Sequence, residues 1–265
     1  MSSARSEAAN CELPVLRKTL RLCEDALSAV SIRPGADVAD RLVKAFVAKA
    51  TRTLKAIILL YERGLCEEAQ SLVRILFELH VNCSMVILML HQDMTDACRR
   101  LLDSVMLAKI KQQRATHLRG LEAAPGAPSR QVMEKKEGAI ASRYTPGECE
   151  ALGKHGFSGK NMEQRCRTLD KRGGGTGFSD TYNVVYRNFS RNVHSTDIVE
   201  SLLNVDPPLV SARAGDLVES RDQVACDVVL TIALSMVDAL NREFGLGLDS
   251  RLTEVRRLRM RAASQ

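Results

Sequence analysis

The side chains best suited to chemistry lie in the sequence YRNFSRNVHS. Arg187 and His194 are seven residues apart, or about two helical turns, so a helix would place them on one side within ~20° of each other. A guanidinium beside an imidazole supplies a fixed cation and a group that titrates near neutrality, as phosphate chemistry requires. Ser190 and Tyr186 add two hydroxyls, and Arg191 adds a second guanidinium. The segment is therefore a candidate site, and the alternative is that His194 is a helix-terminal or core residue.

A second polar group falls at i, i+4 and i+8 of an apolar segment: Arg74, Glu78 and Asn82. Polar residues on a buried helix must be paired. One interpretation is an Arg–Glu pair within the helix that faces solvent. The other is that this ladder faces the helix that carries Arg187 and His194. On the second interpretation we expect Glu78 to contact Arg74 or Arg187, and His194 to lie within ~10 Å of that cluster, the usual axis separation of packed helices.

The sequence indicates neither a metal site nor a cofactor. The eight cysteines include no CxxC pair, and the five histidines have no partner at ligand spacing. In a chain without an export signal, such cysteines are typical of reduced core residues. The GGGTG sequence at residues 173–177 could hold phosphate at a helix start, but it lacks the following Lys-Ser/Thr and a preceding strand. A linker is the better interpretation.

Composition and charge limit the possible partners. The N-terminus is polar, and no uninterrupted apolar run approaches the ~20 residues of a membrane span, so we expect a cytoplasmic protein with no membrane contact. The net charge is +6. The excess gathers in residues 99–119, 130–172 and 249–265, which suggests RNA or another anionic partner, or simply solvated helix faces. Aromatic residues are only 4%, which argues against a base-stacking platform.

Helical periodicity dominates the chain, so the expected class is all-α. Residues 38–63 and 66–91 should form a long antiparallel hairpin that turns at Gly64, the centre of a helical bundle. Further helices are predicted at residues 96–119, 131–143, 147–153, 162–170 and 215–244, with one more through the site segment and a turn at 206–208. On helix 96–119 the expected apolar side comprises Leu101, Leu102, Val105, Met106 and Ile110.

These elements predict one helical domain over residues 1–265. Within it, residues 120–177 are expected to be an irregular insertion or lid, because Pro, Gly and polar residues interrupt the pattern. Residues 249–265 should form a basic C-terminal helix or tail. A second copy of the chain or another protein is a further expected partner.

Two segments resemble an uncharacterised, mainly bacterial helical family, domain of unknown function 5677. They are YERGLCEEAQSLVRILFELHVN at residues 61–82 and YNVVYRNFSRNVHS at residues 182–195. The matching positions are Gly64, Glu68, Ala69, Arg74, Glu78, Tyr186, Arg187, Ser190 and His194. The resemblance covers most of residues 40–240. It implies a helical fold and a site, and no particular reaction.

A more distant similarity is to the HEPN superfamily of helical domains, many of them ribonucleases in toxin–antitoxin and antiphage systems. Their motif is Arg, four to six residues, then His, often with Asn after the Arg. Here Arg187 and His194 have six residues between them, and Asn188 follows the arginine. The resemblance implies a metal-independent endoribonuclease in which Arg74, Glu78, Asn82, Tyr186, Ser190 and Arg191 support the Arg–His pair. The alternative is a non-catalytic sensor or adaptor in which the same side chains form a structural network.

Overall fold

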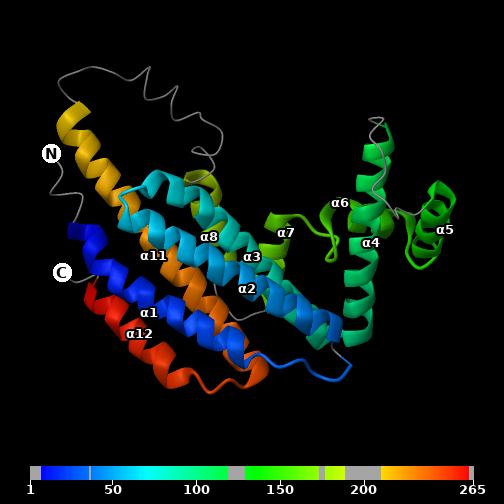
Figure 1. The fold of residues 1–265 in the computed structure, drawn as a ribbon, viewed down its shortest axis with the longest axis horizontal. Coiled ribbons are helices and arrows are strands. Elements are labelled where there is room, and N and C mark those ends of the chain that lie inside the picture. Colours follow the sequence, from blue (N-terminus) through cyan, green and yellow to red (C-terminus); the bar gives the residue numbers. More distant parts are fainter. Residues whose placement is uncertain (1–6, 36, 119–128, 173–176, 189–209, 263–265) are drawn as a thin grey trace.

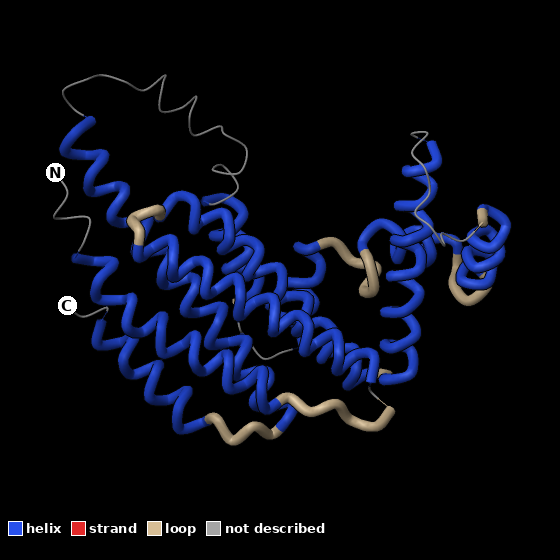
Figure 2. The backbone as a smooth tube through the Cα atoms, viewed as in Figure 1, coloured by secondary structure: helices blue, strands red, loops and turns tan. Residues whose placement is uncertain are grey.

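The computed structural model describes residues 7–35, 37–118, 129–172, 177–188 and 210–262. These ranges hold ten helices and no strand, so the predicted all-α class is confirmed (Figures 1 and 2). The helices are α1 (Glu7–Ala29), α2 (Asp37–Glu62), α3 (Cys66–Gln92), α4 (Met94–Leu118), α5 (Arg130–Ala141), α6 (Pro146–His155), α7 (Met162–Arg172), α8 (Phe178–Asn188), α11 (Val210–Phe244) and α12 (Asp249–Ala262).

The body of the molecule is built on the α2–α3 hairpin, as predicted. Gly64 makes the turn with a φ of 72°, a conformation that favours glycine. Helix α11 packs against α3, and α1 packs against α2, α11 and α12, so α3 is covered on several sides (Figure 1). Phe77, Val73 and Val81 of α3 are fully buried. Helix α1 was not predicted from the sequence, and α11 begins five residues before its predicted start.

Helices α4, α5 and α6 form an arm that leaves one end of the body (Figures 1 and 2). Leu107, Ile140 and Leu152, one from each helix, form a small hydrophobic core of their own. Local chemistry sets the start of α6: the Thr145 hydroxyl accepts from the Glu148 N–H, and the Glu148 carboxylate accepts from the Thr145 N–H. This reciprocal cap satisfies two helix-start donors. The described part of the expected insertion contains three regular helices, α5, α6 and α7, close to the positions predicted.

The predicted apolar side of α4 is partly wrong. Leu101 and Ile110 are buried, but Leu102 and Val105 are 55% and 52% exposed. The reason is that α4 packs against α2 and α3 of the hairpin and also against α5 and α6 of the arm, so its buried residues do not form one straight stripe. The predicted turn at 206–208 lies outside the described residues.

Two core helices have the length and composition of a membrane span. They are the segments Glu68–Gln92 of α3 and Val224–Phe244 of α11. Within the structure 56% and 61% of their most apolar windows are buried, as in the central helices of a bundle. Because a few polar residues interrupt both segments, a search for uninterrupted apolar runs does not detect them.

A buried charge cluster closes the end of the body where α1, α2, α3 and α11 meet. Arg33 donates to Asp40 Oδ1 at 2.7 Å and to Glu243 Oε1 at 2.7 Å, and its guanidinium lies 4.6 Å from the centre of the Phe244 ring. The His91 Nε2 atom is 2.6 Å from the other Glu243 oxygen. The Asp40 and Glu243 side chains are 0% and 4% exposed. Arg33 therefore neutralises two carboxylates that are out of reach of water.

Arg33→Ala should lower the free energy of unfolding by about 3 kcal/mol, because it leaves two buried carboxylates without their main cation. The matched control is Arg17→Ala, which breaks the exposed Arg17–Glu62 pair and should cost less than about 1 kcal/mol. Urea denaturation of the two variants measures the difference. An equal loss of unfolding free energy in the Arg33 and Arg17 variants would contradict a stabilising role for the buried charge cluster.

Candidate functional site

The ladder on α3 faces helices α7 and α8. Arg74 Nε donates to Glu78 Oε1 at 3.0 Å, so the pair within the helix exists. The Tyr186 hydroxyl of α8 donates to the same oxygen at 2.7 Å. The expected contact of Glu78 with Arg74 is confirmed. The structure therefore has features of both interpretations of the ladder. Arg74 and Glu78 pair within α3, and the same pair contacts α8 through Tyr186.

Aromatic stacking extends this contact along α8. The Arg74 guanidinium carbon lies 4.6 Å from the centre of the Tyr186 ring, within cation–π range. Tyr182, one turn earlier, stacks on Tyr186 with ring centres 4.4 Å apart. Burial, with the adjacent Glu78 carboxylate, raises the pKa of Tyr186, so its hydroxyl stays protonated and donates. Tyr186 is thereby held by Glu78 through its oxygen and by Arg74 through its ring.

The third ladder residue, Asn82, receives a buried arginine from α7. Arg165 donates to Asn82 Oδ1, to the His155 carbonyl, and through Nε to the Lys160 carbonyl at 2.9 Å. Its guanidinium lies 5.0 Å from the centre of the Phe157 ring. Burial lowers the pKa of Arg165. Within the described ranges no carboxylate forms an ion pair with Arg165. Its positive charge is contacted instead by neutral oxygens and by one aromatic face.

Arg165 was not among the predicted site residues, although the sequence pattern of α7 indicates its burial. Met162, Cys166 and Leu169 repeat at helical spacing and define the buried side of α7. Arg165 is three residues after Met162 and four before Leu169, so it lies on that same side. A charged residue on a predicted buried side needs oxygen partners, and the ladder on α3 supplies one of them.

The start of α8 is capped from α7. The two carboxylate oxygens of Asp170 accept from the N–H groups of Phe178 and Ser179, each at 2.8 Å. These are donors that a phosphate at the helix start would need. Residues 173–176 of the GGGTG sequence lie outside the described residues. The occupied donors favour the linker interpretation over a phosphate cradle.

His80 of α3 is a buried, neutral ring. It is 4% exposed, stacks on Phe178 with ring centres 4.9 Å apart, and its Nδ1 has no hydrogen-bond partner among the described residues. Burial lowers the pKa of His80 to about 4. A histidine in this state serves packing rather than proton transfer near neutral pH.

The structure places only part of the predicted chemical group. The backbone of Arg187 lies in the last turn of α8, directly after the anchored Tyr186, but its side chain is outside the description. Ser190, Arg191 and His194 also lie outside the described residues. The expected approach of His194 to Glu78 therefore stays a prediction. In the described part of the chain no three His, Cys, Asp or Glu side chains are grouped as metal ligands.

Ion pairs occupy much of the positive charge seen in the basic stretches. On α12, Arg251 pairs with Asp25 of α1, and Arg259 pairs with Asp227 of α11. The arginines of α4 are also paired: Arg99 and Arg100 with Asp96, and Arg114 with Glu137. These two faces are therefore less available to an anionic partner than their composition suggests.

Comparison with family models returned one match, the family of unknown function DUF5677, over residues 40–206. This match spans more than half of the chain. The chain belongs to the DUF5677 family. The matched region runs from α2 through α8 and contains the whole ladder, its partners on α7 and α8, and the Arg187–His194 motif. Comparisons with curated proteins and with solved structures returned no match.

Tyr186→Phe should destabilise this DUF5677 protein by about 1–2 kcal/mol, because it removes the hydroxyl donor to Glu78 and keeps the stacked ring. Tyr182→Phe is the matched control on the same helix, since its hydroxyl makes no hydrogen bond to the described residues. Thermal and urea denaturation measure both. A larger loss from the Tyr182 variant would contradict the anchoring role of Tyr186.

Stability should fall as the pH falls from about 6.5 to about 4, in part through His80. In this window the unfolded chain binds a proton at His80 and the folded chain does not, so each pH unit costs at most about 1.4 kcal/mol. His80→Phe should reduce this slope, whereas Tyr182→Phe, which removes no group that titrates in this window, should not. The check is urea denaturation across the window, and an unchanged slope in the His80 variant would contradict the low pKa.

Proposed function

We propose that this protein is a metal-independent endoribonuclease of HEPN-like type, with His194 and Arg187 as its catalytic pair. The observation that carries the proposal is the docking of α8 at Tyr186. Glu78 accepts the Tyr186 hydroxyl at 2.7 Å and Arg74 covers the ring at 4.6 Å. Tyr186 comes one residue before Arg187, so its contact with α3 also fixes the backbone of Arg187. Catalytic groups work best when a rigid element fixes them.

The proposed chemistry divides between the two motif residues. His194 exchanges a proton with the ribose 2′-hydroxyl or with the leaving oxygen, a role suited to a group that titrates near neutrality. Arg187, assisted by Arg191, offsets the charge that develops on the phosphate. Ser190 positions the phosphate. Because its hydroxyl is engaged by Glu78, Tyr186 is assigned to positioning α8.

The same proposal includes the setting. RNA is the substrate, the cytoplasm is the compartment, and the toxin or antiphage systems in which HEPN ribonucleases act are the biological context. RNA would be recognised by cations that remain unpaired, because the arginines of α12 are largely engaged with α1 and α11.

A second candidate function is a non-catalytic sensor or adaptor. One observation favours it: the described members of the network satisfy one another. Glu78 accepts from Arg74 and Tyr186, and Asn82 accepts from Arg165. Such a closed arrangement is typical of a structural network that joins helices.

Incubation of the purified protein with mixed RNA in EDTA tests the first proposal. We expect cleavage to products with 2′,3′-cyclic phosphate ends, and loss of at least about 10²-fold in rate for His194→Ala, the usual contribution of a general acid or base. His155→Ala is the matched control, since the described role of His155 uses only its carbonyl.

The two candidates are separated by activity and stability together. The ribonuclease proposal requires that His194→Ala removes cleavage and leaves the melting temperature near that of the unaltered protein. Equal RNA loss with the unaltered and His194→Ala proteins would contradict the ribonuclease proposal. No cleavage by either protein, with a lowered melting temperature for Arg74→Ala, would favour the structural alternative.

A further inference from the structure

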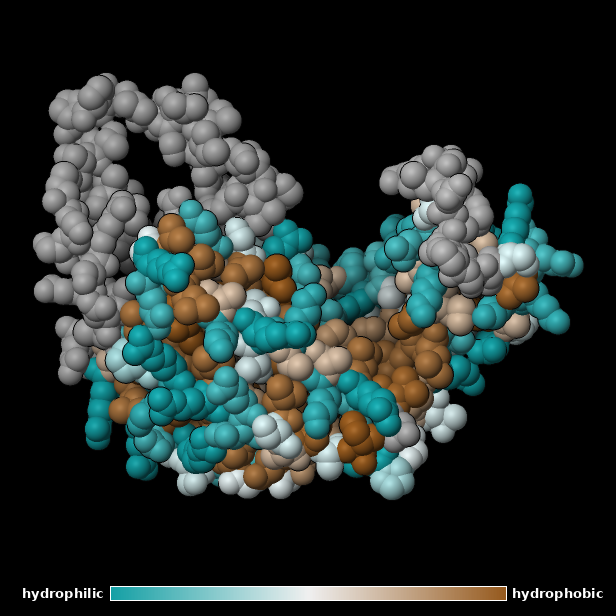
Figure 3. All heavy atoms as spheres, in the orientation of Figure 1, coloured by the Kyte–Doolittle hydropathy of each residue, from teal (hydrophilic) through white to brown (hydrophobic). Residues whose placement is uncertain are grey.

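A cavity of about 270 Å³ lies where the arm joins the body, between the end of α3, the start of α4, the loop before α7, and α7 itself. Figure 3 shows the surface hollowed between the body and the arm, with hydrophobic side chains exposed there. The size is close to that of sites for small molecules rather than for polymers. No residue of the ladder lines this cavity, so it is a separate feature of the molecule.

The base of the cavity is apolar and adaptable. Met85, Leu88 and Met89 of α3 line it together with Ala97 of α4. Met85 and Ala97 are buried, and Leu88 and Met89 are half-buried. Methionine side chains are flexible and polarizable, so they can pack against an apolar or aromatic group of varied shape.

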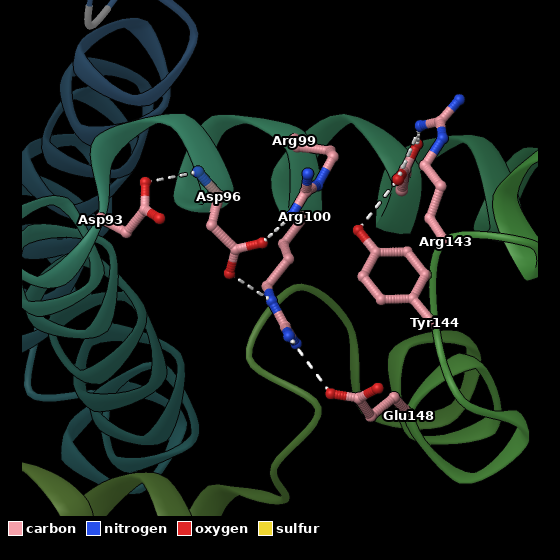
Figure 4. Close-up of polar contacts among 8 residues, drawn as sticks. Asp93, Asp96, Arg99, Arg100, Arg143, Tyr144 and Glu148 are labelled. Atoms are coloured by element: carbon pink, nitrogen blue, oxygen red, sulfur yellow. Dashed lines mark hydrogen bonds and ion pairs between the residues drawn. The ribbon is translucent and has the colours of Figure 1, made fainter.

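The carboxylates of the cavity are already engaged on α4. Asp96 pairs with Arg99 and Arg100, and Arg100 reaches on to Glu148 of α6 at 3.4 Å (Figure 4). Asp93 uses one oxygen to accept the Asp96 N–H at 2.9 Å, which caps the helix (Figure 4). Of the two carboxylates that line this wall, Asp96 is therefore paired with cations, and Asp93 has one oxygen engaged by a backbone N–H.

The cations on the opposite wall have no such partners. Lys160 Nζ donates to the Thr168 hydroxyl at 2.9 Å, which uses one of its three hydrogens. Among the described residues no carboxylate forms an ion pair with Lys160 or with Arg172, and both line the cavity. Gly159, with a φ of 62°, lets the chain turn so that the lysine precedes α7 at this point. Two positive groups therefore face an apolar base.

We propose that this cavity binds a small molecule that carries a phosphate monoester on an apolar or aromatic body. The phosphate contacts Lys160 and Arg172, and the body packs on Met85, Leu88 and Met89. A phosphate monoester carries a charge of about −1.5 to −2 at pH 7, which matches two cations better than a carboxylate does. The inference is independent of the ribonuclease proposal.

Isothermal titration calorimetry with phenyl phosphate tests the site, since this probe has a phosphate monoester on an aromatic ring. We expect saturable one-to-one binding. Inorganic phosphate, phenol and benzoate should each bind at least about tenfold more weakly. Inorganic phosphate lacks the ring, phenol lacks the negative charge, and benzoate carries only one negative charge. Equal affinity for benzoate would overturn the assignment to phosphate, and absence of saturable binding of phenyl phosphate would overturn the site.

Two variants locate the probe. Lys160→Ala and Arg172→Ala should each weaken the binding of phenyl phosphate at least about tenfold, since a charge-assisted hydrogen bond contributes more than the ~1.4 kcal/mol of a tenfold change. The matched control is Lys154→Ala, an exposed lysine of α6 that does not line the cavity. Arg172 is exposed, so its variant tests the site even if the Lys160 variant is unstable. Affinities equal to the control for both variants would overturn the proposal, whatever the RNA assay shows.

Discussion

The arrangement of the middle of this protein depends on three polar side chains on its most central helix. Helix α3 packs against α2, α4, α7, α8 and α11, so polar groups along it must find partners or destabilise the fold. Arg74 and Glu78 find them in each other and in Tyr186 of α8, and Asn82 finds one in Arg165 of α7. This ladder therefore acts together with the buried apolar residues of α7 and α8 to set which sides of these helices face the body.

The ribonuclease proposal and the cavity proposal both depend on how this ladder positions α7 and α8. Docking of α8 at Tyr186 places the backbone of Arg187 beside α3, where the motif with His194 begins. Docking of α7 at Asn82 brings Lys160, Thr168 and Arg172 over the last turns of α3, and the cavity forms between them and α4. One row of polar residues thus underlies both proposals, through the contact of Tyr186 with Glu78 for the ribonuclease and through the contact of Arg165 with Asn82 for the cavity.

Much of the fold could be predicted because the evidence for it is local. The α2–α3 hairpin follows from apolar periodicity and a break at Gly64, and the Arg74–Glu78 pair follows from four-residue spacing. What covers a helix side depends on packing between distant segments, which periodicity does not report. For this reason Leu102 and Val105 were assigned to a buried side, and the cavity between α3, α4 and α7 was not foreseen. Periodicity does place Arg165 on the buried side of α7, but its partners Asn82 and the His155 carbonyl come from other segments. Of the predicted site, only the contacts of Arg74, Glu78, Asn82 and Tyr186 lie within the described residues.

The central claim is that Glu78 of α3 holds α8 through Tyr186, and a double-mutant cycle measures it most directly. The free energies of unfolding of the unaltered protein, Glu78→Ala, Tyr186→Phe and the double variant give the coupling between the two groups. We predict a favourable coupling of about 1 kcal/mol or more, the value of a hydrogen bond to a charged acceptor in a half-buried place. Additive effects, with a coupling near zero, would contradict the account.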